Sequence, residues 1–154
     1  MPLAWRIEKA RRAESAFSGE GARRYGGRWN SRGQRVVYLS QHRSLAALEV
    51  MVNSRPLSAV TDYVIIAAEW DDAIMTSLSE SDLPPDWQIS PPGPATAAVG
   101  DQWLRGLRSA VLSVPSAALP AERNFLVNPA HSDFRRIRIG EPEPFRFDPR
   151  LLQR

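Results

Sequence analysis

Residues 26–53, GGRWNSRGQRVVYLSQHRSLAALEVMVN, place a glycine turn, a β-branched run and an apolar segment in direct succession. The two leading glycines allow close backbone approach, so a tight turn is expected to present Arg28. The run that follows predicts a strand over residues 35–39, on which Tyr38 offers an aromatic face and a hydroxyl group. This stretch therefore predicts a turn that presents an arginine and a strand that carries a tyrosine.

The second half of the stretch predicts a buried helix with one charge. Ser44 is expected to cap this helix, which runs to about Asn53, and Pro56 is expected to end it. Every residue between Ser44 and Asn53 is apolar except Glu49, and a helix that is apolar all round is buried all round. A buried carboxylate must be paired, hydrogen-bonded or facing a cavity. Two interpretations of Glu49 stay open: a structural ion pair with an arginine, or stabilisation of an oxocarbenium-like sugar cation in glycosyl transfer.

The rest of the chain predicts a strand-rich domain with few helices. A helix is expected at residues 95–107, where apolar residues recur at helical spacing, after a long Ser-, Pro- and Asp-rich loop at 79–94. Further strands are expected at residues 3–7, 62–70, 109–116, 123–129, 134–140 and, near the C-terminus, 145–148. No internal repeat or clear domain boundary interrupts them. The predicted fold class is α+β, a single compact mixed domain over residues 1–154.

Length and composition are those of an ordinary globular protein. The chain has 154 residues, of which 43% are apolar and 24% charged. No run approaches the roughly 20 apolar residues of a membrane span, and the N-terminus turns charged before a signal sequence could form. There is no cysteine, hence no disulfide framework and no thiolate metal site. We therefore expect a cytoplasmic protein without membrane contact.

The positive charge is almost entirely arginine. The net charge is +3, the sequence pI is about 9.9, and Lys9 is the only lysine. An arginine fork grips phosphate or carboxylate through two parallel hydrogen bonds, which lysine cannot do. This balance is consistent with an anionic partner, whether nucleic acid, nucleotide or acidic protein, and equally with compositional drift.

Arg28, Tyr38 and Glu49 together make a set that suits a nucleotide. The diphosphate, the planar ring and the ribose of such a ligand would each need one partner, and an arginine, an aromatic residue and a carboxylate provide them. The alternative is that Trp29 and Tyr38 belong to the core while Arg28 lies on the surface.

A third stretch, VPSAALPAERNFLVNPAH at residues 114–131, carries polar residues just after two expected strands. If the strands pair, Ser116, Asn128 and His131 are expected on neighbouring loops. Ser116 could be a nucleophile, but the G-x-S-x-G pattern is missing and His131 lacks a convincing triad partner. We therefore expect Ser116 to donate a hydrogen bond to a ligand.

Several other functional motifs are incomplete or absent. Arg24 stands where a dinucleotide fingerprint needs its third glycine, and no Walker A sequence exists. Two distant histidines without a cysteine argue against a zinc site, so no metal is expected.

An alternative hypothesis from another functional class is a non-catalytic, basic nucleic-acid-binding module. The stretch FRRIRIG, as a strand, would place Arg136 and Arg138 on one face and Arg135 on the other, which makes only a partial patch.

The stretches at 26–52 and 109–134 together resemble the RES domain family, and the likeness runs from LAWRI at residue 3 to FRFDPRL at the C-terminus. The resemblance implies a toxin of a bacterial toxin–antitoxin pair, with a fold similar to ADP-ribosyltransferases of the diphtheria-toxin type. It implies NAD as the substrate, consumed by phosphorolysis to nicotinamide and ADP-ribose-1″-phosphate or by hydrolysis; some members are protein ADP-ribosyltransferases. The implied partner is a helix-turn-helix antitoxin of the Xre class that covers the active site, and no direct nucleic-acid binding is expected outside that complex.

By position, the family's arginine, tyrosine, glutamate and serine correspond to Arg28, Tyr38, Glu49 and Ser116. Arg6 and Asn128 lie in matching contexts as further NAD-binding residues. The resemblance implies that Glu49 faces the ribose and its developing positive charge, and that Tyr38 packs against nicotinamide or ribose. Arg28, helped by Arg6, would grip the NAD diphosphate or an attacking inorganic phosphate, and Ser116 would bond the nicotinamide end or orient the acceptor. The stretch NPAHSDF departs from the pattern, because members often carry a proline after the histidine.

Overall fold

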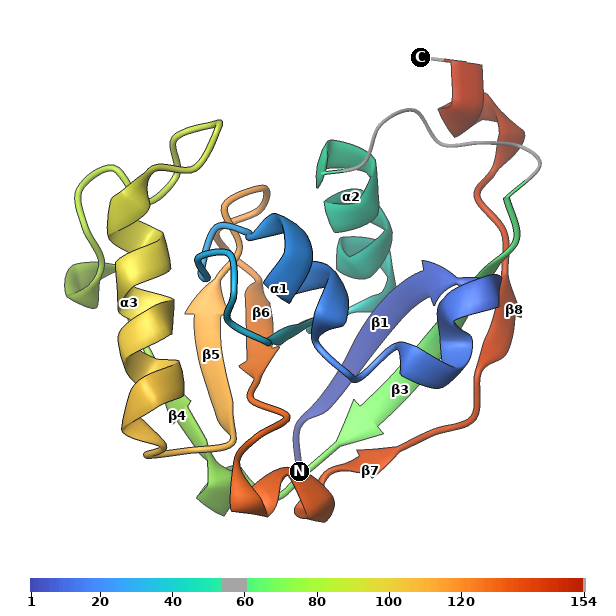
Figure 1. Cartoon of the computed structure of the whole chain (residues 1–154). Helices are drawn as coiled ribbons and strands as arrows, with labels where there is room; N and C mark the ends of the chain where they lie inside the picture. The colour runs from blue at the N-terminus through green and yellow to red at the C-terminus, as the bar shows by residue number, and fades with distance from the viewer. Residues whose placement is uncertain (54–60, 154) are drawn as a thin grey trace.

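The computed structural model describes residues 1–53 and 61–153, in which α-helices pack against a curled, mainly antiparallel sheet (Figure 1). The sheet contains β1 (Leu3–Lys9), β2 (Val37–Ser40), β3 (Tyr63–Glu69), β4 (Met75–Ser77), β5 (Val111–Pro115), β6 (Arg123–Val127), β7 (Arg138–Ile139) and β8 (Glu143–Phe145). Its order is β4-β5-β6-β2-β1-β3-β7, and β8 pairs with β3. The β4–β5 pair is parallel and every other pair is antiparallel.

Within the described residues, three α-helices accompany the sheet: α1 (Glu20–Tyr25), α2 (Arg43–Asn53) and α3 (Pro94–Gly106). Short 3₁₀ segments lie at Ala10–Ser15, Asp72–Ile74, Glu80–Asp82, Ser132–Arg136 and Pro149–Gln153. In Figure 1, α3 flanks β4 and β5, whereas α1 and α2 lie over the middle of the sheet. None of the helices in the described ranges is long and apolar enough to cross a membrane.

The core occupies both faces of the central strands. Side chains alternate along a strand, so on β6 Leu126 packs with Trp103 and Leu104 of α3, whereas Phe125 and Val127 face the opposite cluster. All five residues of β5 are buried. Burial on both faces agrees with the mainly apolar sequences of β5 and of the second half of β6, and it fixes the hairpin whose tip lies beside α2.

The sheet divides between β1 and β2. β1 pairs with β3 along its whole length, from Leu3↔Glu69 to Lys9↔Tyr63. It pairs with β2 only at Trp5↔Ser40. Beyond that point the strands diverge, and the Arg6 side chain reaches across, its Nη1 donating to the Tyr38 carbonyl at 3.0 Å. The sheet therefore has a fork at its centre.

Most of the elements expected from sequence are present, but residues 134–140 do not form a strand. A 3₁₀ helix occupies Ser132–Arg136, and β7 keeps only Arg138–Ile139. Phe134 and Ile137 both pack inward, and this spacing of three fits a 3₁₀ turn better than a strand. Arg136 and Arg138 therefore do not share a strand face, so the partial patch expected of a nucleic-acid-binding module is not formed.

Smaller differences concern the ends of elements. The last strand, β8, covers Glu143–Phe145 instead of residues 145–148, and β4 and α1 were not expected at all. Helix α2 begins at Arg43, so Ser44 lies inside its first turn. Pro56 lies outside the described residues. The expectation that α2 is buried all round is wrong: Val52 is 59% exposed, because this face of the helix borders a cavity instead of the core.

Candidate active site

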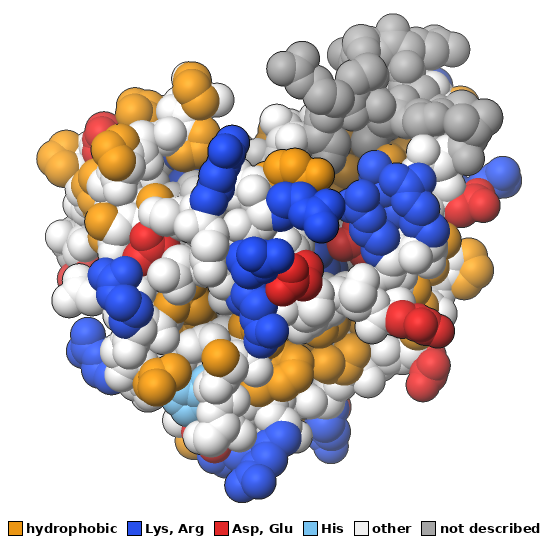
Figure 2. Space-filling view, in the orientation of Figure 1, with side chains coloured by type: hydrophobic (Ala, Val, Ile, Leu, Met, Phe, Trp, Pro, Cys, Tyr) orange, Lys and Arg blue, Asp and Glu red, His pale blue; other side chains and the backbone are white. Residues whose placement is uncertain are grey.

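A cavity of about 810 Å³ opens at the fork between β1 and β2. Small-molecule and cofactor sites occupy about 300–1,000 Å³, so this cavity is large enough for a dinucleotide-sized ligand. The charged residues in its walls are Arg6, Glu8, Arg12, Glu20, Arg24, Arg28 and Glu49. Figure 2 shows basic side chains gathered across the middle of the face on which α1 lies. Four arginines against three glutamates give the cavity an excess of positive charge, which favours an anionic ligand.

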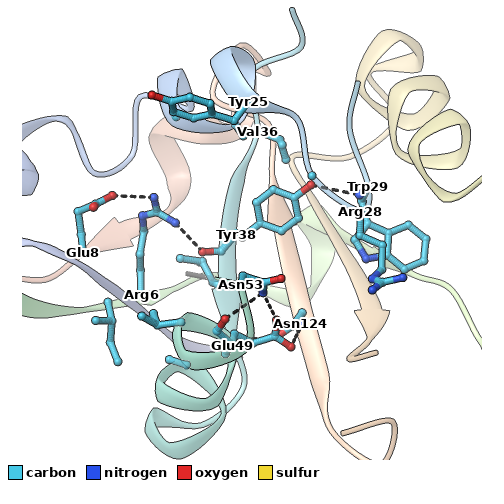
Figure 3. A pocket seen from close by; sticks show the side chains of 18 of the residues that line it. Arg6, Glu8, Tyr25, Arg28, Trp29, Val36, Tyr38, Glu49, Asn53 and Asn124 are labelled. Carbon is cyan, nitrogen blue, oxygen red and sulfur yellow. Dashed lines mark hydrogen bonds and ion pairs between the residues drawn. The ribbon is translucent and has the colours of Figure 1, made fainter. Parts of the chain in front are cut away.

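Glu49 projects from α2 and is held by neutral donors (Figure 3). Its Oε1 accepts hydrogen bonds from Ser116 Oγ at 2.8 Å and from Asn124 Nδ2 at 3.0 Å. Its Oε2 accepts one from Asn53 Nδ2 at 3.0 Å. Among the described residues no arginine forms an ion pair with Glu49. The ion pair between Glu49 and an arginine, one of the two interpretations of this residue, is therefore not formed within the described residues. The Glu49 carboxylate borders the cavity instead.

Tyr38 lies on β2 with its ring in the cavity wall and its hydroxyl engaged by protein (Figure 3). The hydroxyl accepts from the Trp29 backbone N–H at 3.2 Å and donates to Asn30 Oδ1 at 2.5 Å. Burial raises the pKa of Tyr38, so the phenol stays neutral. A Cβ on Gly27 would lie 2.8 Å from the hydroxyl oxygen, so the absence of a side chain there makes room for this network. The ring face is what Tyr38 offers to a ligand.

Arg28 lies in the cavity wall on the side of Tyr38 opposite Arg6 (Figure 3). Its Nη1 donates to the carbonyl oxygens of Trp87 and Ile89, both at 2.8 Å. The side chain thus fastens the turn at residues 26–29 to the loop that precedes α3. Desolvation lowers the pKa of Arg28, partly offset by the charge of Glu49, yet a guanidinium remains charged. Trp29 is core, at 3% exposure, whereas Arg28 and Tyr38 both line the cavity.

Arg6 lies at the fork, and its guanidinium group donates hydrogen bonds to the Tyr38 carbonyl and to the Glu8 carboxylate. Besides the Tyr38 carbonyl, it contacts Glu8, whose Oε2 accepts from Nη2 at 2.9 Å. Its Nε is buried and has no hydrogen-bond partner in the described part of the chain. Burial lowers the pKa of Arg6, and Glu8 opposes that change. Arg6 therefore contributes positive charge to the cavity floor, with one donor on Nη1 and one on Nη2 engaged by protein.

Ser116 was expected to donate a hydrogen bond to a ligand, but in the structure its hydroxyl is engaged by Glu49. It is fully buried, its hydroxyl donates to Glu49, and its oxygen accepts from the N–H groups of Ala118 and Leu119 at 3.2 and 3.1 Å. Its geometry is that of a group that holds Glu49 in place. The sequence pattern does not show in which direction the Ser116 side chain points, so this contact could not be predicted from it.

Asn128 and His131 lie at the other end of the β5–β6 hairpin from Ser116. Because the strands are antiparallel, the end of β5 lies beside the start of β6, where Asn124 is found. Asn128 instead donates from its backbone N–H to Ala110, and its side chain bonds Leu104 and Ala130. Asn128 is not among the residues that line the cavity, so the structure does not bring it together with Arg28, Tyr38 and Glu49. Asn124 was missed, although hairpin pairing of the two strands would have found it.

In residues 1–53 and 61–153, no three His, Cys, Asp or Glu side chains are grouped so that they could hold a metal ion. The groups that line the cavity include a fixed carboxylate, a neutral aromatic ring and several guanidinium groups. This combination can bind a diphosphate and stabilise a developing cation.

Comparison with known proteins finds matches that cover nearly the whole chain. The family model of the RES domain matches residues 3–148. A relative named Toxin Res, from Yersinia enterocolitica serotype O:8 / biotype 1B, is 36% identical over 150 residues, which cover 97% of this chain and 99% of the relative. The Prs ADP-ribosylating toxin of a Sphingobium species is 34% identical over 155 residues, which cover 97% and 96% of the two chains.

A solved structure shares the fold. A chain from the crystal structure of the M. tuberculosis MbcT–MbcA toxin–antitoxin complex superposes with a TM-score of 0.76 at 20% identity, covering 98% of this chain and 86% of that one. At this identity the likeness concerns the fold alone.

Proposed function

Since the chain belongs to the RES domain family, we propose that it is the toxin of a toxin–antitoxin pair and that it consumes NAD by cleaving the bond between nicotinamide and ribose. The observation that carries the proposal is the placement of Glu49, Tyr38 and Arg28 around one cavity of about 810 Å³. We further propose that the curled sheet with its central fork belongs to the same fold type as the ADP-ribosyltransferases.

The cavity offers one partner for each part of NAD. Glu49 would face the ribose, because its carboxylate projects from α2 and lines the cavity (Figure 3). The ring of Tyr38 would pack against nicotinamide or ribose. Arg28, whose Nη1 is engaged by two carbonyls, keeps Nε and Nη2 for phosphate oxygens, and Arg6 adds charge from the other side of Tyr38.

The reaction needs little chemical assistance, because nicotinamide in NAD is a cationic leaving group. When the bond from the anomeric carbon to the ring nitrogen breaks, its electron pair neutralises the ring nitrogen and positive charge develops on the ribose. A fixed carboxylate stabilises that charge. An oxygen of inorganic phosphate then bonds to the anomeric carbon in phosphorolysis; in hydrolysis a water oxygen does so, and its proton passes to solvent.

The test is to incubate the purified protein with NAD, with and without inorganic phosphate, and to quantify both products. Nicotinamide release is expected, and the second product, ADP-ribose-1″-phosphate or ADP-ribose, identifies the acceptor. Glu49→Gln should lower the release at least about 10²-fold, because it removes the charge that opposes the ribose cation, while the melting temperature stays close to that of the wild type. If folded protein releases no nicotinamide under either condition, the proposal is wrong.

A second candidate is transfer of ADP-ribose to a protein, which the name of the Sphingobium relative favours for that relative. Nicotinamide would be released in this case too, so the distinction lies in the other product. Incubation with NAD labelled on the adenosine moiety, in the presence of bacterial lysate, would place the label on a protein band. Label found only in small products excludes this second candidate.

We also propose an antitoxin partner of the helix-turn-helix, Xre class, acting with the toxin in the cytoplasm. The solved neighbour comes from a toxin–antitoxin complex, and an open, basic cavity can be blocked by a carboxylate-bearing segment of a partner. Expression of this chain alone should lower cellular NAD and stop growth, and co-expression of the adjacent helix-turn-helix gene should restore both. Normal growth and NAD with folded, unpartnered protein would contradict the toxin assignment.

A further inference from the structure

Ser40 stands where the two halves of the sheet meet, at one end of a chain of hydrogen bonds that leads to Glu49. It is the β2 residue in the single pair between β1 and β2, and it is also paired in register with Asn124 of β6. Ser40 is 4% exposed and Asn124 is 9% exposed, and both border the cavity. Both residues are therefore held by backbone pairing in a buried position.

The hydrogen bonds in this chain have a defined direction. Ser40 Oγ donates to Asn124 Oδ1 at 2.9 Å, and Asn124 Nδ2 donates to Glu49 Oε1 at 3.0 Å. A flipped Asn124 amide would turn its oxygen toward the carboxylate and its N–H₂ toward Ser40. Two acceptors would then face each other in a buried place, which is unfavourable. The Glu49 carboxylate thus sets the orientation of the amide, and the Ser40 hydroxyl, by donating to Oδ1, holds the amide in place.

The two oxygens of Glu49 consequently have different surroundings. Oε1 has two buried donors, Ser116 and Asn124, which use its two lone pairs. Oε2 has one donor among the described residues, the exposed Asn53 at the end of α2. A ribose hydroxyl can approach Oε2 beside Asn53 or in its place, whereas Oε1 is closed to it.

We propose that Ser40 is a positioning residue for Glu49: by fixing the Asn124 amide, it commits Oε1 to the protein and leaves Oε2 to the substrate. This inference rests on the proposed cleavage of NAD. Ser40 acts through Asn124 and takes no part in the bond that breaks.

The experiment is a double-mutant cycle on nicotinamide release with Ser40→Ala, Asn124→Ala and the double variant. Ser40→Ala should lower kcat about fivefold, the effect of one buried hydrogen bond, with KM changed less than about twofold. In the Asn124→Ala background, Ser40→Ala should have no further effect on kcat, because the amide through which it acts is gone.

Ser109→Ala is the matched control. Ser109 has the same 4% exposure and also forms side-chain hydrogen bonds, to Thr76 and Trp103, but it lies at the far end of the sheet. It should lower the melting temperature as Ser40→Ala does and leave kcat unchanged.

The outcomes separate this inference from the function on which it rests. If the wild type releases no nicotinamide, the proposed function fails first. If the wild type is active and Ser40→Ala keeps full kcat, the positioning role is wrong. The role is equally wrong if Ser40→Ala lowers kcat by the same factor with and without Asn124, or if Ser109→Ala lowers kcat as much.

Discussion

Gly100→Ala is expected to disturb the site from a distance. Gly100 lies in α3 where the helix crosses the turn that carries Arg28, and a Cβ there would lie 1.6 Å from the Trp29 carbonyl oxygen and 2.7 Å from its carbon. Both atoms are backbone, so they cannot rotate away. Because non-bonded carbon contacts lie near 3.5 Å, the turn or the helix would have to move by roughly 2 Å.

This movement would reach several groups of the cavity. Asp101 Oδ1, next to Gly100, accepts from the Ser31 backbone N–H at 2.9 Å, and the Trp29 N–H holds the Tyr38 hydroxyl. Overpacking costs about 1–3 kcal/mol, which corresponds to a fall of about 2–12 °C in melting temperature for a chain of this length. A displacement of about 1 Å in a site can cost 10²-fold in rate, so nicotinamide release should fall at least that much.

The assay is thermal unfolding together with nicotinamide release, with Gly106→Ala as the control. Gly106 lies in the same helix and has no atom within 4 Å of the position of an added Cβ, so alanine there should leave activity unchanged and raise stability slightly. Wild-type activity and melting temperature in Gly100→Ala would refute the reasoning that this contact sets the position of the Arg28 turn.

The other predictions concern cavity side chains directly. Arg28→Lys should lower nicotinamide release nearly as much as Arg28→Ala, because a lysine keeps the charge but loses the fork; full activity of the lysine variant would reduce Arg28 to a surface role. Tyr38→Phe should keep more activity than Tyr38→Ala, because the ring remains, yet it should be less stable than the wild type through loss of the bonds to Trp29 and Asn30. The folded pKa of Tyr38 is raised, so its contribution to stability is complete below the unfolded value of about 10 and is lost as pH rises above it. Denaturant titrations from pH 8 to 11 should therefore show a steeper loss for the wild type than for Tyr38→Phe.

Sequence periodicity located most elements, because β3, β5, β6 and α3 bury whole faces and carry long apolar signals. It missed β4, which has three residues and two exposed side chains, and it mistook the 3₁₀ turn at Ser132–Arg136 for a strand. Such short elements are set by their neighbours more than by their own pattern.

For the site, family resemblance selected Arg28, Tyr38 and Glu49, which the structure brings to one cavity. The rest depended on three-dimensional pairing. Asn124 reaches Glu49 only because β5 and β6 form an antiparallel hairpin, and Ser116 points at Glu49 instead of the open cavity. The spacing of residues along the chain does not show in which direction a side chain points. It also does not show at which end of the hairpin a residue lies.

The fork in the sheet has a mechanical consequence. Separating β1 from β3 would break a ladder that runs from Leu3 to Lys9, and separating β2 from β6 would break one that runs from Val37 to Ser40. A rotation of one half-sheet against the other about the Trp5–Ser40 pair would strain one backbone pairing and the Arg6 side chain. Between the two halves, backbone pairing is thus limited to one residue pair, and side chains provide the other links: Arg6 reaches across the fork, and α2, which packs on β1 and β2, bonds to the β5–β6 hairpin through Glu49.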